Sequence, residues 1–190
     1  MSLSKILDEV RDKTEYKTTT TEKLKLQLFE QCVLETYMWV MELGCDTGNT
    51  TAVLAQAMKE NGGRVLAIDN DPNRVAQAMA LIDRLGLTDS VVFKTMDIYK
   101  PQAWEIISKY PIEFVFVDAM HDGDYPRWDI QNIRKHFPRI PVVMHDYGLK
   151  GSGVKAAIKA EGQVIRKMLG EEKDWNPIKN NTDDWEAVLI

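Results

Sequence analysis

From residue 37 onward, short apolar runs alternate with stretches of helical periodicity, and this alternation limits the folds open to the chain. Five runs are apolar almost throughout and are predicted to be buried strands: 37–43, 64–68, 90–94, 112–117 and 140–144. Helical patterns are found at 51–59, 72–85, 104–110, 126–137 and 154–169. Continuous apolar strands alternating with helices favour right-handed crossovers and an α/β fold, in which helices cover both faces of a parallel sheet.

The two ends of the sequence have a different pattern. Strand-like runs at 175–178 and 185–190 have no helix between them, so they are expected to pair antiparallel. The first 35 residues contain helical patterns at 3–10 and 22–34. We expect one domain over residues 1–190, with 1–35 as an N-terminal helical extension.

Composition narrows the class of protein. The 190 residues carry a net charge of −5, which provides no basic surface for nucleic acid or an anionic membrane. No apolar run is long enough to cross a membrane, and the acidic residues near the N-terminus do not fit a signal peptide. The two cysteines, Cys32 and Cys45, form no metal-binding or redox motif. We therefore expect a cytoplasmic protein with neither nucleic acid nor membrane as a partner.

A glycine-containing turn follows the first predicted strand. Gly44 and Gly48 allow a tight turn and a close approach of a ligand to the backbone, and Thr50 can add a hydroxyl in the first turn of the next helix. The second predicted strand leads into Asp69, about 20 residues after the turn, where an acid can bind both hydroxyls of a ribose. Together the turn and the acid predict a nucleoside site.

The segment Glu42-x-Gly44-x-x-x-Gly48 resembles the first motif of class I S-adenosylmethionine-dependent methyltransferases, and Asp69 resembles their acidic second motif. Asp118-Ala-Met-His121 and His145-Asp-Tyr147 are similar to segments of the small-molecule O-methyltransferase branch. The resemblance implies a Rossmann-like, seven-stranded, mostly parallel sheet with a C-terminal antiparallel strand.

The resemblance also implies an S-adenosylmethionine site. Gly44, Gly48 and Thr50 would line the methionine part, and Asp69 would bind the ribose. Met96 and Asp97 would flank the adenine, and Glu42 and Asp118 complete the expected cofactor-binding residues. Asp46 departs from the family, in which many members have glycine at that position.

Methyl transfer from a sulfonium requires an aligned acceptor atom that has been made nucleophilic. His145, His121 and Asp118 are the candidate catalytic residues, because imidazole titrates near neutral pH and all three follow strands four and five. Either histidine fits the role of base, although a loop histidine can also serve only to bind backbone. The predicted acceptor is an oxygen of a small molecule.

A metal ion is a second way to activate the acceptor. Asp118 and Asp146 follow adjacent predicted strands, so their carboxylates can converge on Mg²⁺, which prefers oxygen ligands. In the catechol-type relatives a third ligand follows the second acid, whereas this chain has Tyr147.

Two other functions fit parts of the pattern. An NAD-dependent reductase would carry G-x-G-x-x-G, but three residues separate Gly44 from Gly48, and no tyrosine is followed four positions later by lysine. A non-catalytic S-adenosylmethionine-binding protein stays open, as does the oligomeric state, with a homodimer among the alternatives.

Overall fold

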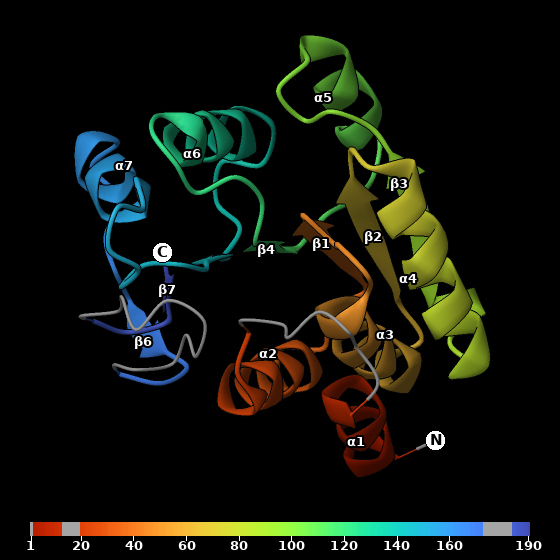
Figure 1. Ribbon diagram of the computed structural model, residues 1–190. Helices are drawn as coiled ribbons and strands as arrows, with labels where there is room; N and C mark the ends of the chain where they lie inside the picture. The colour runs from red at the N-terminus through yellow and green to blue at the C-terminus, as the bar shows by residue number, and fades with distance from the viewer. Residues whose placement is uncertain (1, 13–19, 173–183) are drawn as a thin grey trace.

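The computed structural model describes residues 2–12, 20–172 and 184–190. Within them, seven strands form one sheet in the order β3-β2-β1-β4-β5-β7-β6 (Figure 1). The strands are β1 (Trp39–Leu43), β2 (Arg64–Asp69), β3 (Val91–Thr95), β4 (Phe114–Val117), β5 (Val142–Met144), β6 (Lys167–Leu169) and β7 (Ala187–Leu189). The first five pair in parallel, and β7 pairs antiparallel with both β5 and β6. The predicted fold class is confirmed.

Helices cover both faces of this sheet, as Figure 1 shows. They are α1 (Leu3–Asp12), α2 (Glu22–Leu34), α3 (Asn49–Asn61), α4 (Pro72–Arg84), α5 (Pro101–Ile107), α6 (Tyr125–His136) and α7 (Val154–Ala160). Alternate strand residues point to opposite faces, so Phe114 and Phe116 join the apolar cluster under α1–α4. Val115 and Val117 join the cluster under α5–α7. This two-sided burial explains why the central strands are apolar at almost every position.

The carboxyl ends of the parallel strands lie level with one another. Leu43 of β1 is in register with Ile68 of β2 and with Val117 of β4, and Val117 is in register with Met144 of β5. Because the crossovers all return in the same direction, the residues that follow these strands meet at one edge of the sheet. This edge carries the site described below.

The start and end of α4 follow local chemistry. The Asp71 carboxylate caps the helix by accepting a hydrogen bond from the backbone N–H of Asn73 at 2.8 Å, and Pro72 occupies the first helical position. Beyond the helix, Gly86 has a φ of +65°, a conformation that most residues avoid. The chain can therefore turn back towards β3.

The prediction for the last third of the chain was partly wrong. The helix expected over 154–169 ends at Ala160, and residues 167–169 form β6 instead. Gly162, with a φ of +59°, ends the helical path, and β6 is stabilised by its pairing with β7 rather than by local propensity. The strand predicted at 175–178 lies outside the described residues. The strand predicted at 185–190 is present as β7.

Across the described ranges, none of the helices has both the length and the apolar character needed to cross a membrane.

Candidate active site at the carboxyl edge of the sheet

Backbone hydrogen bonds extend the sheet one residue past its parallel strands and thereby fix the residues that begin the site. The N–H groups of Gly44, Met96, Asp118 and His145 donate to the carbonyls of Ile68, Asp69, Leu43 and Val117 at 2.9, 2.9, 2.8 and 3.0 Å, respectively. These four residues come from the ends of β1, β3, β4 and β5. A site built on strand ends has little freedom to move.

Two glycines in the turn after β1 are required by their surroundings. Gly44 has a φ of +87°, and a Cβ there would overlap the carbonyl oxygen of Asp118. Gly48 has a φ of +90°, and a Cβ there would lie 2.9 Å from the Cα of Ala78 in α4. Asp46 also has a positive φ, of +43°, although it carries a side chain. The backbone of this turn therefore lies close both to β4 and to α4.

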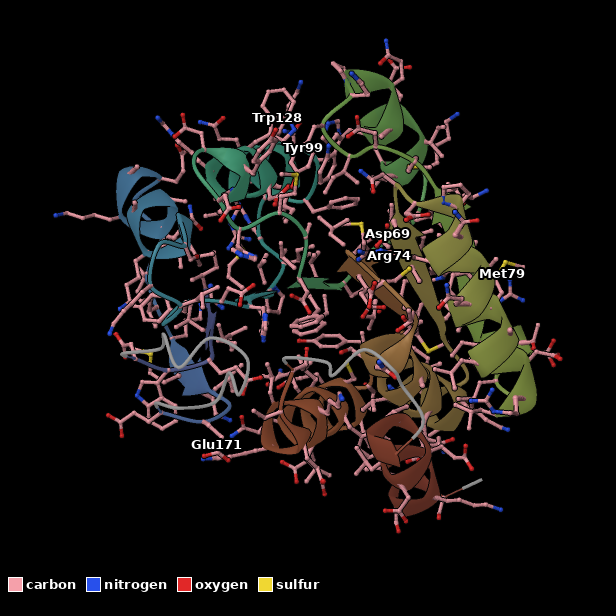
Figure 2. The ribbon with its side chains drawn as sticks, in the orientation of Figure 1. Asp69, Arg74, Met79, Tyr99, Trp128 and Glu171 are labelled. Carbon is pink, nitrogen blue, oxygen red and sulfur yellow. The ribbon has the colours of Figure 1, made fainter. Side chains whose placement is uncertain are left out.

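The Asp69 carboxylate is held by two backbone amides. Its Oδ2 accepts from the N–H of Asp46, and its Oδ1 accepts from the N–H of Asp71, both at 3.0 Å. Arg74 lies beside this group, as Figure 2 shows, and its Nη1 is 2.7 Å from Asp46 Oδ1. The carboxylate is thus oriented in advance for a ligand that brings its own donors.

A cavity of about 420 Å³ opens at this edge of the sheet. It is lined by Gly44, Asp46, Ile68, Asp69, Asn70, Asp71, Arg74, Met96, Asp97, Ile98, Tyr99, Asp118, Ala119, Met120, His121 and Asp122. Its volume is within the range of small-molecule and cofactor sites. Of the predicted site residues, it brings together Gly44, Asp69, Met96, Asp97, Asp118 and His121.

Other predicted site residues do not line this cavity. Glu42 is buried, and its Oε2 accepts a hydrogen bond from the Thr51 hydroxyl at 2.5 Å. Burial raises the pKa of Glu42 to about 8, although the bond from Thr51 opposes this shift. Gly48 and Thr50 form the start of α3, where Thr50 is buried.

His145 and Asp146 form a second group with Asp118, close to the cavity. His145 Nδ1 lies 2.9 Å from Asp118 Oδ1 and 3.3 Å from Asp146 Oδ2. His121 Nδ1 lies 3.0 Å from the same Asp146 oxygen. The side chain of His145 is fully buried, whereas that of His121 is 30% exposed. Both predicted histidines and both predicted metal ligands therefore belong to one cluster.

Burial and charge oppose each other in this cluster. Burial alone would lower the pKa of His145, but the carboxylates of Asp118 and Asp146 raise it well above its ordinary value. Burial alone would raise the pKa of Asp146, but His145 and His121 hold it below its ordinary value. Burial raises the pKa of Asp118 despite the nearby His145. The geometry favours a charged imidazole between two carboxylates, or a metal ion held by the same three side chains.

A divalent cation has suitable donors in this cluster. Asp118, His145 and Asp146 each offer one ligand atom, and these atoms all lie within 4.8 Å of one another. Two carboxylate oxygens suit Mg²⁺ or Mn²⁺, and an imidazole nitrogen also suits zinc or iron. The residues present therefore fit a metal ion, with a nitrogen donor in addition to the two predicted acids.

Two residues that the sequence did not predict contact this cluster. The Thr20 hydroxyl donates to Asp118 Oδ2 at 3.3 Å. Glu186, a fully buried carboxylate, lies with its Oε1 3.4 Å from His145 Nε2 and accepts hydrogen bonds from Thr21. The sequence held one signal for Glu186: it is a charged residue within the apolar run 185–190, and a charge that is buried in such a run requires a partner.

Comparisons with known proteins relate this arrangement to enzymes. A family model described as a methyltransferase domain matches residues 41–147. A catechol O-methyltransferase from Niastella koreensis is 37% identical over 83 residues, which are 42% of this chain and 36% of that protein. The match thus spans about a third of the length of that relative.

Solved structures share the fold at low sequence identity. An O-methyltransferase from Bacillus cereus, solved in complex with SAH, is 15% identical with a TM-score of 0.68. The match covers 98% of this chain and 88% of that one. The O-methyltransferase TomG from Streptomyces achromogenes, solved in complex with SAM, is 17% identical with a TM-score of 0.60, over 98% of this chain and 86% of that one.

Proposed function

Because this chain belongs to the methyltransferase-domain family, we propose that it transfers the methyl group of S-adenosylmethionine to an oxygen of a small molecule. One observation carries the proposal: a single cavity is lined by the glycine turn, by the preoriented carboxylate of Asp69 and by the partly exposed imidazole of His121. These are a cofactor site and a base on the same edge of the sheet.

In this proposal the cofactor lies along the cavity. Its methionine part lies against the turn at Gly44, and Asp69 accepts hydrogen bonds from both ribose hydroxyls. The adenine lies between Met96 and Asp97, at the end of β3. Glu42, Gly48 and Thr50 support the turn from behind, where their burial places them. We also propose that residues 1–190 form one domain, with the helices of residues 1–35 as its extension.

We assign the role of base to His121. It lines the cavity; its Nδ1 lies 3.0 Å from Asp146 Oδ2 and its Nε2 lies 3.7 Å from Asp122 Oδ1. In the proposed reaction Nδ1–H donates to Asp146, and Nε2 takes the proton of the acceptor. The acceptor hydroxyl gives its proton to Nε2, and its oxygen attacks the methyl carbon in line with the sulfur. The C–S bond breaks, its electrons stay on sulfur, and S-adenosylhomocysteine leaves. His145 is buried, so we assign it the orientation of Asp118 and Asp146.

We further propose that Asp118 and Asp146, joined by His145, hold a divalent cation such as Mg²⁺. A cation there would lower the pKa of an acceptor hydroxyl that binds to it. The proposal rests on the convergence of the three ligand atoms. A net charge of −5 and the likeness to a catechol O-methyltransferase favour a small molecule over nucleic acid as the acceptor.

The proposal is tested by incubating the protein with S-adenosylmethionine, Mg²⁺ and catechol, and measuring S-adenosylhomocysteine. Turnover above a blank without catechol is expected. His121→Ala should lower turnover and leave the dissociation constant of S-adenosylhomocysteine within about twofold, since a base contributes about 10²–10⁴-fold to rate. Failure of the wild type to bind S-adenosylhomocysteine would exclude the proposal. Binding without turnover on any hydroxylated acceptor would instead favour a non-catalytic cofactor-binding protein.

A further inference from the structure

Glu186 is a buried carboxylate that the proposed reaction leaves unused, although it contacts the histidine cluster. It lies just before β7 and is 0% exposed. Its Oε1 accepts from the N–H of Thr21 at 2.7 Å, and its Oε2 accepts from the Thr21 hydroxyl at 2.5 Å and from the N–H of Glu171 at 3.2 Å. A buried charge with several donors is held in one orientation.

The third residue that contacts the Glu186 carboxylate is His145. Its Oε1 lies 3.4 Å from His145 Nε2, while the other ring nitrogen, Nδ1, faces Asp118 and Asp146. Facing a carboxylate oxygen, Nε2 is held as a hydrogen-bond donor, which fixes both the rotation of the ring and the proton on that side. Nδ1 is then directed at the two aspartates, whether it donates to them or binds a metal ion beside them.

The same carboxylate also fixes the start of α2. Thr21 caps this helix, because its hydroxyl oxygen accepts from the N–H of Leu24 at 3.2 Å. Its neighbour Thr20 donates to Asp118, the residue at the end of β4. The N-terminal part of the chain therefore reaches the cluster at two consecutive residues.

The turn after β6 closes over Glu186 from the other side. Gly170 has a φ of +76°, and a Cβ there would overlap the Glu186 side chain. The N–H of Gly170 donates to Gln27 Oε1 in α2 at 2.7 Å, and Lys23 of the same helix pairs with Glu171 at 3.5 Å. Figure 2 shows Glu171 beside α2. Glu186 thus lies where α2, the turn after β6 and His145 meet.

From this geometry we propose that Glu186 is a positioning residue for the reaction, which rests on the function proposed above. It holds His145 so that Nδ1 faces Asp118 and Asp146, and it ties the start of α2 to the catalytic cluster. The helical extension at the N-terminus therefore completes the site in addition to covering the sheet.

The first test observes the imidazole itself and needs no acceptor. The chain has three histidines, so ¹⁵N-histidine labelling gives three ring systems, and His121→Gln and His136→Gln identify the signals of His145 by elimination. In the wild type we expect an Nε2–H signal of His145 that exchanges slowly with water, because the ring is buried. Glu186→Gln should shift or abolish it. An unchanged His145 spectrum in Glu186→Gln would overturn the proposal.

Glu161→Gln is the matched control, because Glu161 pairs with Arg127 at the surface, away from the cluster. It should leave the His145 signals as they are. If Glu186→Gln does not fold, as judged by thermal melting, Thr21→Val is used instead, since it removes one donor and keeps the carboxylate. It should shift the same signal, and Thr21→Ser should restore it. No shift in Thr21→Val would count against the coupling to α2.

A second test separates positioning from cofactor binding. In Glu186→Gln we expect turnover of catechol to fall about 10- to 100-fold, the usual effect of losing a partner that orients a histidine. The dissociation constant of S-adenosylhomocysteine should stay within about twofold. Equal losses in binding and turnover would contradict positioning. If the wild type does not turn over, the proposed function fails, while the spectrum still decides the role of Glu186.

Discussion

Replacement of Asp69 by alanine is the sharpest test of the cofactor site. Both oxygens of this carboxylate already accept a backbone N–H, from Asp46 and Asp71, so the group is oriented before the cofactor binds. It therefore needs little reorganisation to accept the ribose hydroxyls. A hydrogen bond to a charged group is worth about 1.5–3 kcal/mol, which corresponds to a loss of about 10- to 160-fold in affinity.

The assay is calorimetric titration of S-adenosylhomocysteine at pH 7, with thermal melting to confirm that the variant is folded. The two amides released in Asp69→Ala lie in partly exposed loops, where water can replace the carboxylate, so a modest loss of stability is expected. Asp69→Asn keeps one acceptor oxygen and should show an intermediate affinity.

Asp89→Ala is the control, because Asp89 is exposed and precedes β3, at the opposite edge of the sheet. It removes the same charge from the protein without touching the cavity. An affinity in Asp69→Ala that stays within about twofold of the wild type, or that falls equally in Asp89→Ala, would refute the placement of the ribose.

Three further predictions follow from the same geometry. Gly44→Ala should lower the melting temperature and abolish cofactor binding, because its Cβ would overlap the Asp118 carbonyl. Gly62 also has a positive φ, of +76°, but a Cβ there would meet no atom within 4 Å, so Gly62→Ala should cost only about 1 kcal/mol of strain. Equal effects of the two substitutions would contradict the steric argument. Burial raises the pKa of Asp129 from 3.8 to about 8, so the unfolded chain loses this proton first, and the contribution of Asp129 to stability should fall as the pH rises from about 4 to 8. Urea unfolding of Asp129→Asn should show a weaker pH dependence over this range, and a slope identical to that of the wild type would exclude a buried neutral acid. EDTA should lower turnover of catechol and added Mg²⁺ or Mn²⁺ should restore it, while activity insensitive to EDTA would exclude the metal ion at Asp118 and Asp146.

The central sheet was predictable because strands that are buried on both faces consist of consecutive apolar residues, and that pattern is visible in the sequence. A strand covered on both faces is apolar at almost every position. All five parallel strands, β1–β5, lie within the predicted ranges or extend one residue beyond them. The signals at the ends of α4 were equally local, since a capping carboxylate and a proline act on neighbouring residues.

The error at β6 has the opposite cause. Lys167, Met168 and Leu169 are all good helix formers, and only pairing with β7 makes them a strand. That partner lies 20 residues further along the chain, beyond the reach of local patterns. Two of the three residues are exposed, so β6 also lacks the apolar pattern of the central strands.

The candidate site was predictable where it depends on strand ends and not where it depends on helix docking. Asp69, Asp97, Asp118 and His121 line one cavity because each lies at or just beyond the end of a parallel strand. The contact of Glu186 with Thr21 joins residues 165 positions apart and depends on how α2 packs against the sheet. Likewise, only the tertiary structure shows that the ring of His121 is partly exposed and that of His145 is buried.

The position of β7 has a consequence for synthesis on the ribosome. This strand lies between β5 and β6, although it is translated after both of them. In a nascent chain that has emerged only as far as residue 172, the place of β7 between β5 and β6 is not yet filled. Until residues 186–189 emerge, the edge of β5 has no neighbour on that side, and His145 has no carboxylate opposite its Nε2. The addition of β7 thus completes the pairing of β5 and places Glu186 against His145 in the same step.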